Sequence, residues 1–415
     1  MPAACEAKGY EKRNSCGWLE SMIDALLRAD SMLELCLMGW DSRPCDIQIG
    51  RVRYVSFAES GLTWYSKIPL RFQQKAQRLI KEFNPDLIHV QGTEYFYGCF
   101  PQEVYCGKPV VVSIQGLISG IHPHYMGGIS PRELRGTNWN ARFFLKGRTL
   151  LSEQTTWREG RAVQEQKVLR QQSNFIGRTS WDRDVIHFYN PTARYFMVNE
   201  NLRPPFFTVR RTAQTVKRHS IYCSAAASTA LKGAHWLIRA VSALKSEFPD
   251  IELRIAAASG LHSPKGLKGL LLDQSYQSYL RRLIKEWDVG KHIVALPSLP
   301  AEKVAEELQR AELFVLPSMC ENSPNSLGEA MLVGTPSIAT FVGGVPSILK
   351  DGVEGKLVPS GDPAALAGAI RRWFTHPEEA EASIKPARAT ALKRHDTKTN
   401  AEATLAVYRE LVVSC

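Results

Sequence analysis

The chain has 415 residues, of which 44% are hydrophobic and 22% charged, and a formal net charge of +11, which describes a globular protein long enough for roughly two or three domains. No run approaches the roughly 18 apolar residues of a membrane-spanning helix, and the first 20 residues lack a signal-peptide core, so we expect neither spanning nor secretion. The nine cysteines include no C-x-x-C pair, which favours reduced cytoplasmic thiols without a structural metal.

In the first half of the chain, helical and strand-like segments alternate, a pattern typical of parallel sheets with helices on both faces. We expect helices at 18–27 and 69–83 and strands at 33–38, 52–57, 86–90 and 109–114. Between Arg132 and Arg211 there are 15 Lys and Arg against 7 Asp and Glu, an anion-attracting balance. For the polar helix at 152–172 we interpret this charge as a solvated face, and no nucleic-acid-binding motif accompanies it.

The alternation repeats in the second half, where strands are expected near 220–223, 253–257, 293–296, 313–316 and 336–339. A segment containing proline and arginine, 202–218, predicts the boundary between two Rossmann-like domains at 1–205 and 206–390. The last stretch, 391–415, is predicted to hold a helix that packs back toward the first domain.

The most informative stretch runs from Glu321 to Glu329 and carries two carboxylates eight residues apart. Ser323 followed by Pro324 predicts an N-cap and a proline at the first helical position. The amides expected at this helix start, those of Asn325, Ser326 and Leu327, suit a phosphate. A phosphate site between two carboxylates that can accept hydrogen bonds from sugar hydroxyls indicates a nucleotide sugar.

Two carboxylates at a helix start are common, and a pair sharing acid and base work, as in a glycosidase, is the other interpretation of them. One carboxylate lies in a loop and the other on the helix. This placement favours a role in which each of them binds hydroxyl groups of a nucleotide sugar. Gly343 and Gly344 follow the predicted strand 336–339, at the edge of an open α/β sheet where ligands bind.

The stretch 317–359 resembles the donor half of retaining glycosyltransferases of family 4, the group 1 type with the GT-B fold. The residues that carry the resemblance are Glu321 and Glu329, Gly334-Thr335-Pro336, Gly343-Gly344 and the run from Asp351 to Gly355. It covers 215–412 well and the first half loosely. The family implies an α/β fold with an acceptor-binding domain at 1–205 facing a nucleotide-sugar-binding domain at 206–390 across a cleft.

The resemblance also implies roles. Lys232 and Glu321 are the expected catalytic residues, with Lys232 and the helix start stabilising the departing diphosphate and Glu321 holding the donor sugar. Glu329 is expected to hold the ribose, and Leu296 belongs to a stretch, 296–299, whose backbone is expected to recognise the base. The family needs no metal and no cofactor besides the nucleoside-diphosphate sugar.

The chain departs from the family where an arginine usually helps Lys232 to clamp the diphosphate, because Ala227 stands there. Loss of such a contact costs about 1.5–3 kcal/mol unless another residue replaces it. Arg178 and Arg203 are the expected substitutes.

For the acceptor, a glycan or lipid-linked molecule, the expected contacts are Gly17, Glu94, Gln115, His122 and His124. Many family members have a histidine where the strand here ends in Gln115, and glutamine cannot act as a base. His89, inside its strand, is interpreted as a packed histidine.

The first sheet lacks its opening strand, since the residues before Gly17 hold no apolar run. Either an upstream start supplies that strand, which we favour, or the protein lacks it. These observations fit a cytoplasmic glycosyltransferase of surface polysaccharide synthesis. Its basic N-terminal half is a candidate for contact with the inner face of the membrane. A sugar-nucleotide epimerase or hydrolase, or a non-catalytic partner subunit, remains the alternative.

Overall fold

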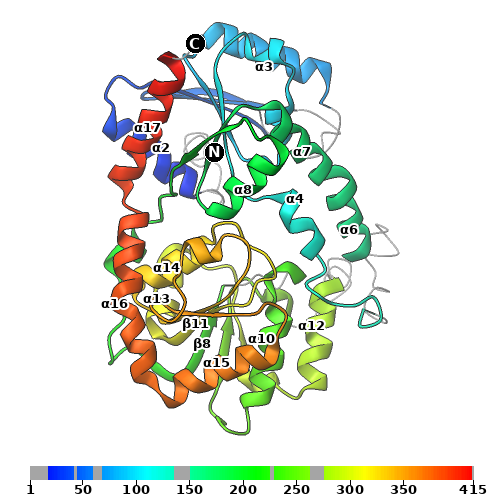
Figure 1. Ribbon diagram of the computed structural model, residues 1–415, viewed down its shortest axis with the longest axis vertical. Coiled ribbons are helices and arrows are strands. Elements are labelled where there is room, and N and C mark those ends of the chain that lie inside the picture. The colour runs from blue at the N-terminus through cyan, green and yellow to red at the C-terminus, as the bar shows by residue number, and fades with distance from the viewer. Residues whose placement is uncertain are drawn as a thin grey trace.

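The computed structural model describes residues 17–41, 44–58, 68–134, 150–224, 229–261 and 275–413. Two α/β lobes lie one above the other along the long axis of the molecule, the N-terminal lobe uppermost (Figure 1). The predicted class, α/β with parallel sheets, is confirmed.

The C-terminal lobe is built on a six-stranded parallel sheet in the order β10-β9-β8-β11-β12-β13. Its strands are β8 (Lys217–Cys223), β9 (Glu252–Ile255), β10 (Ile293–Ala295), β11 (Ala311–Leu316), β12 (Ser337–Thr340) and β13 (Lys356–Val358). Every residue of β11 is buried, which explains its nearly continuous apolar sequence, because a central parallel strand is covered on both faces.

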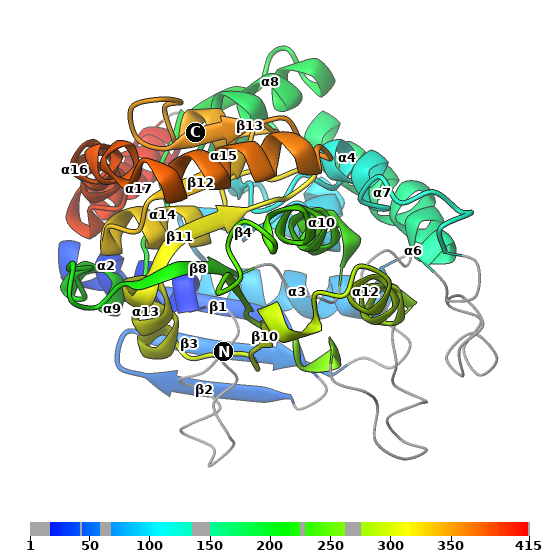
Figure 2. The ribbon, with the colours of Figure 1, turned by 90° about the horizontal axis from the view of Figure 1, so that it is seen from below.

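Helices cover both faces of this sheet, and Figure 2 shows α9, α13 and α14 on one side of it and α10 and α12 on the other. One set comprises α10 (Ala234–Leu244), α12 (Ser275–Glu286) and α15 (Pro363–Thr375), and the other α9 (Pro205–Thr208), α13 (Ala301–Arg310), α14 (Asn325–Val333) and α16 (Pro377–Arg394). Leu313 packs with the first set and Phe314 with the second, as the two-residue period of a strand requires.

The N-terminal lobe contains two separate sheets where a single one is expected. Four parallel strands form the larger sheet, β4 (Ile88–Gln91), β5 (Val110–Ser113), β6 (Asn174–Gly177) and β7 (Arg194–Met197). The smaller sheet has the order β1-β3-β2, with β1 (Leu35–Trp40) parallel and β2 (Cys45–Ile49) antiparallel to β3 (Val52–Phe57). Among the described residues no strand precedes α2 (Gly17–Ala29).

Helices α3 (Leu70–Phe83) and α8 (Ser180–Tyr189) also belong to this lobe, as does the predicted polar helix. The latter is divided into α6 (Leu150–Thr156), a π-helical turn (Trp157–Arg161) and α7 (Ala162–Gln171). The interpretation of a solvated face holds for the exposed Lys167 and Arg170, but α7 also buries Glu165 completely.

Besides the link between β7 and β8, two described segments cross between the lobes. Tyr125, Met126, Ile129 and Leu134 lie in the predicted first domain but pack into the core of the C-terminal lobe. In the other direction, α17 (Thr397–Val413) packs against α2 and the larger N-terminal sheet, where the last helix was predicted to lie (Figure 1). None of the described helices is long and apolar enough to cross a bilayer.

Candidate active site

The loop after β11 carries Glu321 and leads into α14, as predicted, but the predicted N-cap is wrong. Helix α14 begins at Asn325, and Pro324 is its N-cap, with no side-chain capping bond. Pro324 has an extended backbone, with ψ at 109°, so the helix starts one residue later than expected. Since the Leu327 amide already donates to the Pro324 carbonyl at 3.1 Å, the amides of Asn325 and Ser326 are left to serve a ligand at this end.

Lys232 and Glu321 form an ion pair at the carboxyl ends of the strands. Lys232 Nζ lies 2.5 Å from Glu321 Oε1, to which Ser318 Oγ also donates at 2.8 Å. The Lys232 side chain is 35% exposed and that of Glu321 10%, so the ammonium group borders solvent while the carboxylate is fixed.

Glycine brings these two segments together. Gly233, directly after Lys232, has a φ of +71°, and a Cβ there would lie 1.9 Å from the Pro317 carbonyl oxygen. The backbone beside Lys232 therefore touches the start of the Glu321 loop, an approach that only glycine permits.

Gly343 and Gly344, predicted to contact the donor, lie against the other side of the same loop. A Cβ at either would lie 2.1 Å from a carbonyl oxygen, that of Glu321 or of Asn322, and the Gly344 amide donates to the Glu321 carbonyl at 3.0 Å. Their observed role is to fix the backbone of the loop that presents Glu321.

Glu329, on the first turns of α14, pairs with Arg203. Arg203 Nη2 donates to Glu329 Oε1 at 2.8 Å, and the side chains are 36% and 8% exposed. Burial raises the pKa of Glu329, and the neighbouring guanidinium opposes that rise. Arg203 was expected to bind the diphosphate in place of the arginine that Ala227 replaces. In the structure it instead contacts Glu329, the residue expected to bind the ribose.

Arg178 is buried, and its guanidinium pairs with Glu200 at 3.1 Å. A second arginine, which the sequence interpretation missed, lies beside it. Arg394 Nη2 donates to the Arg178 carbonyl at 2.8 Å and lies 3.4 Å from Ser323 Oγ, just before α14. Burial lowers the pKa of Arg394 to about 10. The basic run Lys393-Arg394 at the end of α16 is the signal in the sequence, but only the fold brings it to this helix start.

Leu296 follows β10, and both of its backbone groups are occupied. Its amide donates to the Ile255 carbonyl and its carbonyl accepts from the Ala258 amide, each at 2.8 Å. Backbone recognition of a base in the predicted stretch therefore falls to the following residues, of which Ser298 is exposed. Ala227 lies outside the described residues.

The opposite lobe meets this loop at Asn322. Asn322 Nδ2 donates to the Gln115 carbonyl at 3.2 Å, and Thr179 Oγ1 donates to Asn322 Oδ1 at 3.0 Å. The segments predicted to hold donor and acceptor thus adjoin each other.

Glu94 and Gln115, both predicted to contact the acceptor, lie close together on the N-terminal lobe. Glu94 Oε1 accepts from the Gly116 amide at 2.6 Å, and burial raises the pKa of Glu94. The other carboxylate oxygen of Glu94 and the Gln115 amide nitrogen are buried and have no partner in the described structure. Buried polar atoms usually have a hydrogen-bond partner, either a protein group or an ordered water.

Glu165 of α7 was not predicted, and it holds the segments that follow β4 and β5. Thr93 Oγ1 donates to Glu165 Oε1 at 2.6 Å and the Ser119 amide to Oε2 at 2.5 Å. Complete burial raises the pKa of Glu165 to about 7. Only its spacing from Val168 and Leu169 places it on the buried face of α7 in the sequence.

His122 and His124 occupy a short 3-10 turn where the chain leaves the N-terminal lobe. His124 is exposed and His122 half-buried, and burial lowers the pKa of His122. Gly127, just beyond, accepts bonds from His235 and Trp236 of the C-terminal lobe, each at 2.9 Å. The two histidines therefore lie close to where the lobes join, while Gly17 is simply the first residue of α2.

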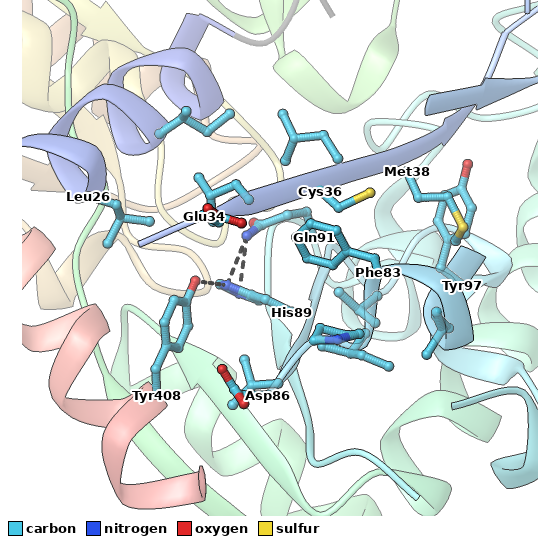
Figure 3. A pocket seen from close by; sticks show the side chains of 18 of the residues that line it. Leu26, Glu34, Cys36, Met38, Phe83, Asp86, His89, Gln91, Tyr97 and Tyr408 are labelled. Carbon is cyan, nitrogen blue, oxygen red and sulfur yellow. Dashed lines mark hydrogen bonds between the residues drawn. The ribbon is translucent and has the colours of Figure 1, made fainter. Parts of the chain in front are cut away.

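The packed role predicted for His89 is confirmed. Its ring bonds to Tyr408 Oη at 2.6 Å and to Ser113 Oγ at 2.7 Å (Figure 3 shows the tyrosine contact), and burial lowers its pKa to about 3.

Comparison with known proteins shows which sequences and structures this chain resembles. Residues 208–390 match the family described as glycosyl transferases group 1. A D-inositol 3-phosphate glycosyltransferase of Streptomyces coelicolor is 30% identical over 172 residues, 40% of this chain and 34% of the relative. The chain thus spans about a third of the length of that relative.

Solved structures of the same fold match more than nine tenths of the chain. Sucrose-phosphate synthase from Thermosynechococcus elongatus superposes with a TM-score of 0.70 at 17% identity over 96% of this chain and 93% of the other. HepE from Anabaena, solved in complex with UDP-glucose, gives 0.61 at 14% identity over 92% of this chain and 100% of the other.

Proposed function

Because the chain has the GT-B fold and carries a glycosyl transferases group 1 domain at 208–390, we propose that it is a retaining glycosyltransferase of family 4. In this proposal it moves a sugar from a nucleoside-diphosphate donor to a glycan or lipid-linked acceptor, without a metal ion. We place this activity in surface polysaccharide synthesis, in the cytoplasm, with the basic N-terminal half as the surface that contacts the membrane.

The contact between Lys232 and Glu321 at the start of α14 is the observation that carries the proposal. A departing diphosphate gains negative charge, which an ammonium group and the positive end of a helix dipole both stabilise. Glu321, fixed by Ser318, is available to accept hydrogen bonds from sugar hydroxyls beside that phosphate.

In the transfer, the bond between the anomeric carbon and the diphosphate oxygen breaks, and its electron pair leaves with the nucleoside diphosphate. The acceptor oxygen bonds to the anomeric carbon on the same face, and its proton passes to the departing diphosphate oxygen, which has received that electron pair. Lys232 and the α14 amides hold the leaving group, and Glu321 holds the sugar in position. Glu329 takes the ribose hydroxyls after releasing Arg203.

Arg394 supplies the second phosphate-facing cation in this proposal. Its guanidinium is already beside Ser323, whereas Arg178 is turned to Glu200 and Arg203 to Glu329.

Nucleotide binding and turnover test the proposal. We expect one of UDP, GDP and ADP to raise the melting temperature, since a ligand at 100 times its Kd stabilises by about 2.7 kcal/mol. With the matching sugar nucleotide and an acceptor, transfer with retained configuration should continue in EDTA. Loss of transfer in EDTA and its recovery with a divalent ion would contradict the metal-independent mechanism. Consumption of the donor at the same rate without any acceptor would favour the epimerase or hydrolase alternative.

A further inference from the structure

Arg161 is the last residue of the π-helical turn between α6 and α7, close to where the two lobes adjoin (Figure 1). This turn, Trp157–Arg161, packs against α4 (Ile118–Ile121) and against the 3-10 turn His122–His124. Single π-helical turns interrupt the regular hydrogen bonding of a helix and are frequent at functional sites. None of the residues assigned above to the donor or the acceptor belongs to this turn.

Arg161 lies on the face of the helix that meets the loops after β4 and β5. It precedes Glu165 by four residues, and residues with this spacing lie on one face of a helix. Glu165 accepts hydrogen bonds from Thr93 Oγ1, after β4, and from the Ser119 amide, after β5. Burial raises the pKa of Glu94, next to Thr93, and the positive charge of Arg161 is one of the influences that oppose this rise.

The guanidinium group of Arg161 has no hydrogen bond or ion pair within the part of the chain that the structure describes. Its Nε is buried, and its Cζ lies 4.5 Å from the centroid of the Trp157 ring, on which the group stacks. The stretch 135–149, which leads into α6 in the sequence, contains no Asp or Glu. Because a buried N–H group normally has a partner, we expect a ligand or an ordered water at this position.

The other basic side chains of the site differ from Arg161 in this respect. Lys232 and Arg203 each pair with a carboxylate, and Arg394 donates to a carbonyl oxygen. Glu94 is a carboxylate on which the charge of Arg161 acts, yet the two do not form an ion pair, and Glu94 Oε2 is buried without a partner among the described residues. A cation and a carboxylate that influence each other without pairing are arranged to bind a third group.

Trp157 connects Arg161 with the catalytic ion pair. Its ring is partly buried and packs against Leu231 and Cys320. These two residues immediately precede Lys232 and Glu321 in the chain. A group bound to Arg161 is therefore separated by one indole ring from the loops that hold the donor in the proposed reaction.

We propose that Arg161 binds an anionic group of the acceptor, a phosphate or a carboxylate, while Glu94 accepts a hydrogen bond from an acceptor hydroxyl. This inference rests on the proposed glycosyltransferase function and narrows the acceptor to a sugar or other polyol that carries a negative charge. The Nε–H and one Nη–H of a guanidinium group form a planar fork that matches two oxygens of either anion. Arg161 is then a specificity-determining residue.

Binding at two points explains both orientation and selection of the acceptor. An acceptor held at Arg161 and at Glu94 cannot rotate freely, so one of its hydroxyl groups is presented to the anomeric carbon of the donor. A neutral acceptor that displaces water from Arg161 leaves the buried Nε–H without a partner, which weakens its binding. The site therefore selects for charge as well as for shape.

Chemical modification resolved to single arginines tests the anion site without any turnover. Phenylglyoxal reacts with the full chain, and mass spectrometry of the peptides gives the rates at Arg161 and Arg170. Arg170 is the matched internal control, since this exposed residue also stacks on an aromatic ring, that of Tyr189, at 5.1 Å. The probes are inorganic phosphate, glucose 6-phosphate and glucuronate, each compared with glucose and with sodium chloride at the same ionic strength.

We expect at least one of the three anionic probes to slow the modification of Arg161 by about fivefold or more, the factor for a probe at about four times its Kd. The rate at Arg170 should not change. The same protection should appear in Lys232→Met, because the anion site is distinct from the site of the departing diphosphate. Equal protection by chloride, equal slowing at both arginines, or no slowing by any of the three anions would overturn the proposal.

Turnover tests the role of Arg161 toward the acceptor. With the donor identified by thermal shift, Arg161→Met should raise the KM for a charged acceptor by about tenfold or more and leave the KM for the donor unchanged. Arg161→Lys keeps the charge without the planar fork and should recover part of this loss, and Arg170→Met should match the parent.

The outcomes of the two experiments separate this proposal from the proposed function. Equal kcat/KM of the parent for a charged acceptor and for its neutral counterpart would overturn the assigned specificity. Absence of transfer to every acceptor would contradict the glycosyltransferase function, whereas the modification rates at Arg161 would still decide whether it binds an anion.

Discussion

Lys232 and Glu321 lie 89 positions apart in the chain, and close backbone contacts at Gly233 and Gly343 hold them together. The types of these two residues could be predicted from the sequence because their neighbours resemble a known family. Their direct contact could not, since it depends on where two loops from different strands meet. The position of Arg394 could not be predicted either, because it lies beside the start of α14 only as a result of the way α16 packs.

Substitution of Lys232 by Met is expected to lower kcat/KM for sugar transfer by about 100- to 1000-fold, because one preorganised charge facing the leaving group is lost. Glu321→Gln keeps the shape of the carboxylate and should lower the same quantity through weaker contacts to the sugar. Steady-state kinetics with the donor found by thermal shift measure both. Lys245→Met is the control, because Lys245 bonds to the turn of Trp287 and Asp288, away from Lys232 and Glu321, and its rate should match that of the parent. A rate of Lys232→Met within threefold of the parent would exclude the assigned role.

Glu165 makes stability depend on pH. Its pKa is about 7 in the folded protein against an ordinary value of 4.5, so the folded state binds a proton more tightly than the unfolded state. The contribution of this group to stability is therefore full below about pH 4.5 and is lost as the pH rises toward 7. We expect Glu165→Gln to become more stable relative to the parent across this window, as measured by urea unfolding. The exposed Glu103→Gln should follow the parent at every pH, and a Glu165→Gln curve parallel to the parent would refute the prediction.

At the scale of elements, β11 and α14 could be predicted because a buried apolar run ends in a loop and a helix of Ala and Leu follows. The start of α14 was placed one residue early, since proline is compatible with both the N-cap and the first helical position. The strands β2, β6 and β7 were missed: β2 has no fully buried residue, Asn174 and Gly177 flank the two apolar residues of β6, and β7 begins with the charged Arg194. The separation of the N-terminal strands into two sheets depends on tertiary packing and has no local signal.

The start of α14 and the end of α16 are expected to act together on the nucleotide. Arg394→Met should weaken nucleoside-diphosphate binding by about tenfold or more, since charge-assisted hydrogen bonds contribute about 1.5–3 kcal/mol. Isothermal calorimetry, well below the melting temperature, gives the Kd. Arg388→Met is the matched control on the same helix, because Arg388 bonds to the Leu332 carbonyl near the other end of α14. Equal Kd values for both variants would remove Arg394 from the site.

On the scale of the whole molecule, α16 and α17 connect the lobes along one side, while the segment Tyr125 to Leu134 connects them elsewhere (Figure 1). The predicted division at 205 and 206 falls within α9, and Leu202 and Phe206 on either side of it pack in the same core. The alternation of helical and strand-like segments in the sequence predicts where the sheets are. It does not predict on which lobe a connecting segment packs.

Leu405 of α17 is buried against Ala25 and Leu26 of α2, so Leu405→Ala should destabilise the protein by about 2–5 kcal/mol. Hydrogen exchange should show faster opening of α2 than of β11 in this variant. Glu402→Ala, on the exposed face of the same helix, should leave both unchanged. Uniform acceleration at α2 and β11 would mean that the lobes unfold only together.

The packing of α17 on α2 also sets the order in which the protein is completed during synthesis. Domains generally fold as they emerge from the ribosome, the first one earliest. Here α2 waits for α17, because its partners Ala401 and Leu405 are translated long after it. The N-terminal lobe is consequently translated before the C-terminal lobe but completed only after it, so we expect a chaperone to act on its uncovered apolar surface in the nascent chain.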